Sequence, residues 1–312
     1  MPTAGLLKIG ARGSPLSLAQ TGLTAGLLEA AHPGLLTEIV PIKTAGDRLL
    51  EAPLAKIGGK GLFVKEIEEA LLSGAIDLAV HSAKDLPAEL PAGLRLGATP
   101  ERADFRDVLV ARAPGGLTAL PAGARVGTSG LRRQAQLLAA RPDLAISGLR
   151  GNVGTRLKKL ATDFEAIVLA AAGLARLKAT GPNLTLLAPE VMLPAAGQGV
   201  LALETRVGDD RVLGLLAPLN HRPTALALAA ERGFLRRLGS GCQSPVAALA
   251  RLDKGRMTLE GLIASLDGRE VVRGRKTASV AAPEAAAGLG SALALELLER
   301  GGRKIMTANE GI

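Results

Sequence analysis

Short apolar runs alternate with amphipathic stretches along the amino-terminal part of the chain. The runs that predict strands lie at 6–12, 38–43 and 76–80. After the first run, Ser14 can cap a helix and Pro15 suits its first position, so we expect a helix from Pro15 to about Ala31. A second helix is predicted to end near Ser73. Strands that alternate with helices indicate an α/β lobe with substantial parallel pairing.

The same alternation returns after a charged connector at 100–107 and then changes. One further strand is predicted to end with 125–127, and others are predicted at 143–149, 166–172 and 200–203. Beyond about Asn220 the pattern predicts a helix, three strands with hairpin-length connections and a last helix, at 224–238, 246–252, 257–265, 270–278 and 282–299. The stretch 194–199 (PAAGQG) has the composition of a mobile link. The pattern therefore predicts two α/β lobes and a small C-terminal α+β domain with an antiparallel sheet.

The charge balance narrows the class of ligand. Lysine and arginine number 38 against 29 aspartate and glutamate, which gives a formal net charge of +9. A basic surface attracts anions, but the chain has no tryptophan or tyrosine and only four phenylalanines, so base-stacking platforms are nearly lacking. The basic residues are also spread along the chain. This distribution favours a cleft for a small polyanion over a nucleic-acid face.

The number and spacing of the cysteine and histidine residues predict the cellular compartment and whether the protein binds a metal ion. One cysteine cannot form an internal disulfide, which fits a reducing cytoplasm. We see neither a signal peptide at the start nor a run approaching the roughly 18 apolar residues of a membrane span, so we expect a soluble protein. The three histidines and one cysteine lack ligand spacing, so no metal site is predicted.

Glycines and arginines follow several of the predicted strands. The stretch 56–63 (KIGGKGLF) opens a helix, and it is either an anion cradle or a plain connector. Lys84 and Asp85, in the segment 81–87 (HSAKDLP), point to opposite sides if extended, so one can meet an acidic ligand while the other serves chemistry. A solvated charged turn is the alternative there, and a structural role is the alternative for His81. Three later strand exits each carry arginine, at 128–134, 150–156 and 173–176, and together they predict an anion pocket.

The lone thiol, Cys242, lies in a turn of small residues that Pro245 closes. Such a cysteine is either a small buried hydrophobe or a sulfur presented to a cleft.

These motifs, in this order, resemble the porphobilinogen deaminase (hydroxymethylbilane synthase) family over nearly the whole chain. The matching pieces are RGSPL at 12–16 with Gln20, PLAK at 53–56, GKGLF at 59–63, HSAKDLP at 81–87, VGTS at 126–129, LRRQ at 131–134, LRGNVGTR at 149–156, GQG at 197–199, and GC at 241–242 with Pro245.

The resemblance implies a domain plan and an activity. It implies two lobes like those of periplasmic binding proteins, at 1–99 with 200–217 and at 105–193, and a third domain at 220–312 that carries the cysteine. It also implies a monomeric transferase of haem and tetrapyrrole biosynthesis, with a dipyrromethane cofactor joined to Cys242 by a thioether. Four porphobilinogen units are added in turn with loss of ammonia, and water releases hydroxymethylbilane.

The resemblance also assigns residues to roles. Asp85 is the catalytic acid, which stabilises the azafulvenium cation left by ammonia and relays protons. The cofactor-binding residues are Cys242, Lys60, Lys84, Ser82, Thr128, Ser129, Arg132, Arg133, Arg150, Gly173 and Gly199. The substrate-binding residues are Arg12, Ser14, Gln20, Arg156, Arg176 and Gln198. Arginine forks suit the acetate and propionate groups of each pyrrole.

Three positions depart from the commonest family pattern. Gly130 stands where many relatives have serine, so one hydroxyl contact to a carboxylate is in doubt. Ser240 and Ser244 also differ, and neither removes a chemically essential group.

Two other classes of protein share some of these features. A two-lobed solute-binding protein would share the fold and the anion pocket, and a nucleic-acid-binding protein would share the charge. Neither would carry a covalent adduct on Cys242.

Overall fold

The computed structural model describes residues 5–45, 64–239 and 244–310. The chain divides into two compact units, Met1–Arg102 with Val200–Ala225, and Ala103–Gly199 with Leu226–Ile312. None of the helices among the described residues is long and apolar enough to cross a membrane.

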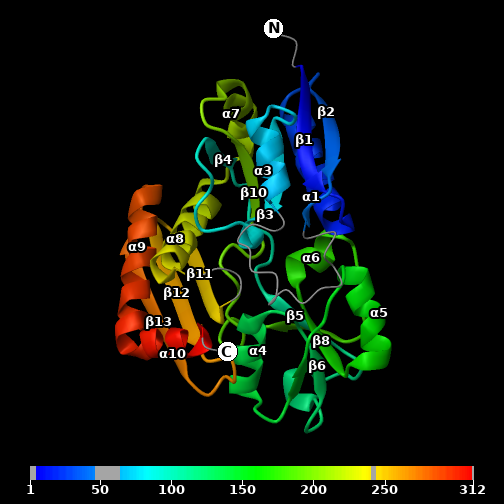
Figure 1. Ribbon diagram of the computed structural model, residues 1–312, viewed down its shortest axis with the longest axis vertical. Coiled ribbons are helices and arrows are strands. Elements are labelled where there is room, and N and C mark those ends of the chain that lie inside the picture. Colours follow the sequence, from blue (N-terminus) through cyan, green and yellow to red (C-terminus); the bar gives the residue numbers. More distant parts are fainter. Residues whose placement is uncertain (1–4, 46–63, 240–243, 311–312) are drawn as a thin grey trace. The chain divides into compact units, whose positions relative to one another are not determined.

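The first unit is built on a five-stranded mixed sheet with the order β2-β1-β3-β10-β4 (Figure 1). Its strands are β1 (Leu6–Arg12), β2 (Leu36–Ile42), β3 (Leu78–Ser82), β4 (Leu94–Ala98) and β10 (Leu201–Arg206). Strands β1, β2 and β3 are parallel, whereas β10 runs antiparallel to both β3 and β4. The helical elements are α1 (Pro15–Ala31), α3 (Lys65–Leu72), α7 (Asp210–Leu216), α8 from Arg222, and single turns at Ala83–Asp85 and Ala217–Leu219.

Alternate residues of these strands fill two apolar layers, one on each face of the sheet. Leu7, Ile9 and Leu203 pack on the face that also holds residues of α1 and α7. Ile67 and Leu71 of α3 cover the opposite face. Helix α1 begins as the sequence predicts, because the Ser14 hydroxyl accepts a hydrogen bond from the Ser17 amide at 3.3 Å.

The second unit contains a sheet of the same plan, with the order β7-β6-β8-β5-β9. Its strands are β5 (Asp107–Ala111), β6 (Arg125–Gly127), β7 (Ala145–Ser147), β8 (Ala166–Ala170) and β9 (Leu184–Leu187). Strand β6 is parallel to β7 and β8, and β5 is antiparallel to β8 and β9. The helical elements are a turn at Leu117–Ala119, α4 (Leu131–Ala140), α5 (Val153–Asp163) and α6 (Ala171–Arg176).

The same unit holds an antiparallel three-stranded sheet, in the order β11-β12-β13. Its elements are α8 (Arg222–Leu238), β11 (Val246–Asp253), β12 (Arg256–Ala264), β13 (Val271–Ser279), α9 (Pro283–Leu297), a kinked turn at Leu298–Gly302 and α10 (Arg303–Glu310). Helices α8 and α9 lie on one face of this sheet (Figure 1), and their buried residues pack against it. On the other face, Leu249 and Leu262 pack with Ala135 of α4 and Leu193.

The expected fold class, two α/β lobes and a C-terminal antiparallel α+β part, is confirmed. Some details of the expectation are wrong. The strand expected over 166–172 ends at Ala170, where α6 takes over. The stretch 194–199, expected to be a mobile link, is almost wholly buried, and the Gly197 amide donates to Glu231 Oε2 at 2.6 Å.

Helices α8 and α9 cross where glycine lets their backbones touch. A Cβ at Gly290 would collide with the Ala230 carbonyl and lie 2.6 Å from the Phe234 amide nitrogen. Backbone atoms cannot rotate away as a side chain can, so an added methyl group must push the helices apart.

We therefore expect Gly290→Ala to destabilise the C-terminal sheet and its helices by about 1–3 kcal/mol through overpacking. Gly288→Ala is the control on the same helix, because a Cβ there meets no atom within 4 Å; alanine at that position should be neutral or slightly stabilising. Thermal unfolding followed by circular dichroism measures both. Equal midpoints for the two variants would contradict the close crossing.

Candidate functional site: two groups of basic and polar residues at strand ends

The three parallel strands of the second unit end at one edge of its sheet. Parallel pairing of β6 with β7 and β8 places the segments that follow Gly127, Ser147 and Ala170 along that edge. The arginine-bearing exits predicted from the sequence therefore do share one sheet edge. We call this edge, with the residues that follow the three strands, the basic edge.

Hydroxyl groups tie two of the loops on the basic edge together. The Ser129 hydroxyl donates to the Leu149 carbonyl at 2.6 Å and accepts from the Leu149 amide at 3.0 Å. The Thr128 hydroxyl accepts from the Gly130 amide at 3.3 Å. Gly130 is the N-cap of α4 and provides no side-chain cap. The amino terminus of α4 is thus held by the preceding hydroxyls, and it favours negative charge in front of it.

Arg132 and Arg133, in the first turn of α4, turn inward to one carboxylate. Arg132 Nη1 lies 2.8 Å from Asp107 Oδ2, and Arg133 Nη2 lies 2.8 Å from Asp107 Oδ1. Asp107 is fully buried, and each arginine is 8% exposed. Burial lowers the pKa of Arg132; the Asp107 charge opposes this effect and the Arg133 charge adds to it. The sequence predicts that both arginines lie in the first turn of a helix, where the structure has them, but it does not reveal their acidic partner.

Arg176, at the end of α6, is a second partly buried cation on this edge. Its Nη2 donates to the Gly199 carbonyl at 2.8 Å. Burial lowers its pKa to about 10, and no carboxylate among the described residues contributes to the shift. Gly199 has φ +87°, and a Cβ there would lie 2.5 Å from the Ala103 carbonyl oxygen, so glycine is required. A ligand carboxylate would relieve the desolvation that Arg176 suffers.

The other predicted residues of this unit occupy the same region of the fold. Arg150 and Arg156 are half-buried, and Arg156 Nε donates to the Gly151 carbonyl at 2.8 Å. Gly173 is buried within α6. The Gln198 side chain donates to the Phe105 carbonyl at 2.8 Å and to Asp107 Oδ1 at 3.1 Å.

The predicted residues of the first unit lie at the ends of β1 and β3. Gln20 on α1 is buried, and its Nε2 lies 2.9 Å from the Ser82 hydroxyl. Arg12 is the last residue of β1, and the hydroxyl group of Ser14 is engaged in the N-terminal cap of α1. Ala83–Asp85 form a single helical turn, so the expectation that Lys84 and Asp85 are extended is wrong.

The exposure of Lys84 and Asp85 differs within that turn. Lys84 is half-buried, whereas Asp85 is exposed and makes no hydrogen bond or ion pair with any described residue. Its carboxylate therefore faces solvent in the described part of the chain. Such a carboxylate can approach a ligand without first breaking a protein contact.

Beneath this turn the first unit holds a buried acidic cluster. His81 Nε2 lies 3.0 Å from Glu204 Oε2, within ion-pair distance, but the geometry is not that of a directional hydrogen bond. Glu68 of α3 lies near both, and its Oε1 is buried without a hydrogen-bond partner among the described residues. Burial raises the pKa of Glu68; Glu204 adds to this effect and His81 opposes it. The structural interpretation of His81 fits this environment.

Two predicted residues, Lys60 and Cys242, lie outside the described residues. Among the described residues no group of three or more histidine, cysteine, aspartate or glutamate side chains could hold a metal ion.

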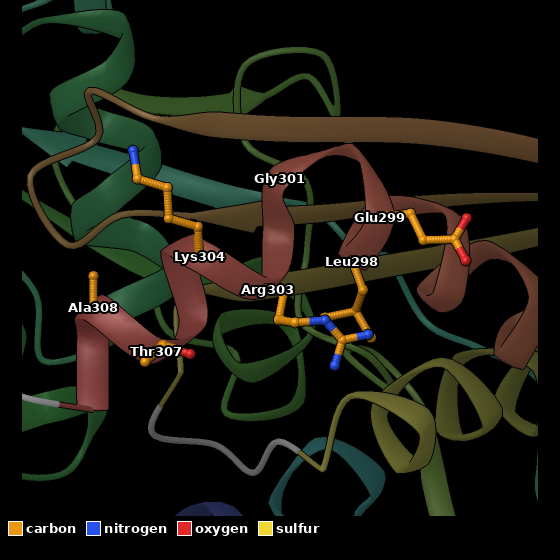
Figure 2. A pocket seen from close by; sticks show the side chains of 7 residues that line it. All are labelled: Leu298, Glu299, Gly301, Arg303, Lys304, Thr307 and Ala308. Atoms are coloured by element: carbon orange, nitrogen blue, oxygen red, sulfur yellow. The ribbon is translucent and has the colours of Figure 1, made fainter.

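One hollow among the described residues is lined by none of the residues of these groups. It has a volume of about 730 Å³ and lies along α10, lined by residues such as Glu299, Arg303 and Lys304. Figure 2 shows Arg303 and Lys304 pointing in different directions, so their charges do not converge on one ligand.

Comparison with known proteins decides the family. Residues 7–214 match the porphobilinogen deaminase dipyrromethane cofactor binding domain, and residues 225–299 match the porphobilinogen deaminase C-terminal domain. The chain belongs to the porphobilinogen deaminase family.

Individual relatives agree with this assignment. A porphobilinogen deaminase from Roseiflexus sp. (strain RS-1) is 54% identical over 301 residues, covering 96% of this chain and 98% of that protein. One from Syntrophotalea carbinolica is 53% identical over 307 residues, covering 98% and 96%.

Solved structures are more distant. The periplasmic aliphatic sulphonate binding protein SsuA from Escherichia coli is 16% identical, with a TM-score of 0.39 over 77% of this chain and 71% of that one. Full-length CbnR in complex with its target DNA is 13% identical, with a TM-score of 0.45 over 69% of each chain. Scores this low support no argument about this chain.

The family's cofactor is a dipyrromethane, and the basic edge fits such a group. A dipyrromethane built from two substrate units carries four side-chain carboxylates. Arg176 is a desolvated cation whose pKa shift has no carboxylate contribution from the described residues, and Arg132 adds a second guanidinium. Guanidinium donors are the groups that bind carboxylates through paired hydrogen bonds.

The buried acidic cluster predicts a particular pH dependence. The folded-state pKa of Glu68 is raised above its ordinary 4.5, so its contribution to stability is present below that pH and is lost as pH rises through the folded value. We expect Glu68→Gln to remove this loss, so that the variant gains stability relative to the parent as the pH increases.

Urea unfolding at several values between about pH 5 and about pH 8 measures the difference. Glu69→Gln, an exposed position on the same helix, is the control and should show no such trend. A parent-to-variant difference that does not change with pH would contradict the buried position of the Glu68 carboxyl.

Proposed function

We propose that this chain is the transferase that joins four porphobilinogen molecules head to tail, with loss of ammonia, and releases hydroxymethylbilane by hydrolysis. Growth occurs on a dipyrromethane primer linked through a thioether to Cys242. The observation that carries the proposal is the family match over residues 7–214 and 225–299. The cationic groups of the basic edge support it, because every added unit brings two more carboxylates.

Each group of residues has a role in this proposal. The primer supplies the pyrrole carbon that accepts each incoming unit. On the basic edge, Arg132 and Arg150 bind the carboxylates of the primer, and Arg156 and Arg176 bind those of the substrate. In the first unit, Arg12 and Lys84 bind carboxylates, and Gln20 orients the Ser82 hydroxyl through their 2.9 Å hydrogen bond. Thr128, Ser129 and Gly199 shape the edge.

Asp85 is the catalytic acid of the proposal. Loss of ammonia from porphobilinogen leaves a cation delocalised over the pyrrole, and a carboxylate beside it lowers the energy of that charge. The same carboxylate can accept the pyrrole N–H and move a proton. Its exposure and its lack of a partner among the described residues support this role.

The proposal also includes domain plan, location and assembly. We propose three domains, 1–99 with 200–217, 105–193 and 220–312, and the three separate sheets support this division. We further propose a cytoplasmic monomer. The lone cysteine suits a reducing compartment, and light scattering of the purified protein measures the assembly state.

Intact-mass spectrometry tests the covalent primer. The purified protein should be heavier than its sequence by one dipyrromethane, and Cys242→Ser should carry no added mass, because the chain has no other cysteine. Ser244→Ala, two residues away, is the control and should retain the adduct. Active protein without added mass would defeat the proposal.

Replacement of Asp85 tests the catalytic role. We expect Asp85→Asn to fold normally and to lower turnover by about 100-fold or more, because an amide carries no charge to stabilise the cation. Glu89→Gln removes a nearby exposed carboxylate and should leave turnover unchanged. Consumption of porphobilinogen measures both, and near-normal turnover in Asp85→Asn would remove Asp85 from the catalytic role.

A further inference from the structure

Asp107 is a fully buried carboxylate on the basic edge to which the sequence motifs assign no role. It is the first residue of β5, and it lies opposite Ala170, the last residue of β8. Because β5 runs antiparallel to β8, the start of β5 lies where the parallel strands end. The topology thus brings a carboxylate to the edge that is otherwise lined by cations.

The Asp107 carboxylate accepts hydrogen bonds from three side chains. Arg132 Nη1 donates to Oδ2 at 2.8 Å. Arg133 donates to Oδ1 through Nε at 3.0 Å and through Nη2 at 2.8 Å, and Gln198 Nε2 reaches the same oxygen at 3.1 Å. A carboxylate with this many partners fixes the direction of each of them.

The two arginines, Arg132 and Arg133, use their hydrogen-bond donors differently. Arg133 presents its Nε–Nη2 edge to Asp107, and its Nη1 donates to the Val168 carbonyl at 3.0 Å. Arg132 uses only Nη1, which also donates to the Leu193 carbonyl at 2.8 Å. Among the described residues, Arg132 Nε and Nη2 have no hydrogen-bond partner in the protein. Neither is among the polar atoms that are fully buried and unpartnered, so both retain some exposure to solvent. The Nε–Nη2 edge is one of the edges that binds a carboxylate through two parallel hydrogen bonds.

We propose that Asp107 is a positioning residue that holds Arg132 with its Nε–Nη2 edge available to a carboxylate of the primer, while Arg133 serves as the buried counter-cation of Asp107. This rests on the proposed function, since it concerns how that enzyme holds its primer. One carboxylate between two guanidiniums leaves one positive charge, which a ligand carboxylate balances.

Two substitutions of Asp107 distinguish the effect of its position from the effect of its charge. Asp107→Asn removes the charge and leaves two adjacent guanidiniums that repel each other. Asp107→Glu keeps the charge but moves the carboxylate by one methylene group, which shifts both arginines. If orientation of Arg132 is what matters, both variants must bind the primer poorly. If charge alone matters, only Asp107→Asn is affected.

The test measures primer loading directly, by intact mass after incubation of each purified variant with excess porphobilinogen. Glu260→Gln is the matched control, because Glu260 is also a carboxylate between two arginines, Arg251 and Arg273, but belongs to the C-terminal sheet. In metal sites, residues that orient a ligating group typically contribute about 10–100-fold in affinity or activity, and we take the same magnitude here. We therefore expect the loaded-to-unloaded ratio to fall at least about 10-fold in both Asp107 variants and to remain at the parent value in Glu260→Gln.

The rate of loading supplies a second readout. Both Asp107 variants should gain the added mass at least about 10-fold more slowly than the parent at the same porphobilinogen concentration. Should Asp107→Asn fail to fold, Asp107→Glu carries the test. Loading of Asp107→Glu at the parent level overturns the positioning role, as does loading of Asp107→Asn equal to that of Glu260→Gln. Absence of the adduct in the parent itself would instead defeat the proposed function.

Discussion

The ion pairs of one buried carboxylate with two arginines organise the basic edge. Removing charges from water is costly, and mutual attraction repays that cost only when the geometry is good and the remaining donors are satisfied. Asp107 meets this condition with bonds to Arg132, Arg133 and Gln198. Buried ion pairs contribute little net stability as a rule, so the main consequence of this one is orientation.

The same topological device appears in the first unit with the opposite balance of charge. In each lobe one strand runs against its parallel neighbours, and each such strand buries an acid. Asp107 begins β5 and faces two guanidiniums, whereas Glu204 on β10 faces His81 and the second carboxylate, Glu68. One lobe therefore holds an excess of buried positive groups and the other an excess of buried acids. Only the first kind of cluster is suited to receive a carboxylate ligand.

Hydrophobic periodicity and local capping signals are sufficient to predict most of the helices and strands. Helix α1 begins at Pro15 because Ser14 caps it, a contact within four residues that the sequence alone reveals. The sequence does not predict strand β5, because its five residues follow a charged connector and their pairing depends on segments that are distant along the chain, at 166–170 and 184–187. The expectation that 194–199 is mobile is wrong for a related reason. Glycine and alanine predict mobility unless a distant group such as Glu231 binds the backbone.

For the candidate site, too, some features can be predicted from the sequence and others depend on the packed structure. Strand-exit arginines could be found from the sequence, because parallel strands place their exits at one edge. Their protonation environment could not, since burial of Arg176 and the pairing of Arg132 depend on the packed structure. An acid at the start of a short apolar run, as at Asp107, was the signal available for the missing partner. Alone it does not distinguish a buried carboxylate from an exposed connector.

The C-terminal sheet is fastened to the basic edge through the same network. Glu231 of α8 accepts from the Ala250 amide of β11 at 2.8 Å and from the Gly197 amide at 2.6 Å, next to Gln198, which bonds Asp107. The Gln134 side chain of α4 donates to the Leu266 carbonyl at 3.2 Å, in the turn between β12 and β13.

Displacing the sheet from α4 would break these bonds and expose the apolar layer that holds Leu193, Leu249 and Leu262. In the sequence, Cys242 lies between α8 and β11, the two elements that Glu231 joins. A primer attached there is thus tied through the backbone to the network that fixes the arginines. A motion that accommodates a longer pyrrole chain by displacing this sheet would therefore have to break the hydrogen bonds of Glu231 and Gln134.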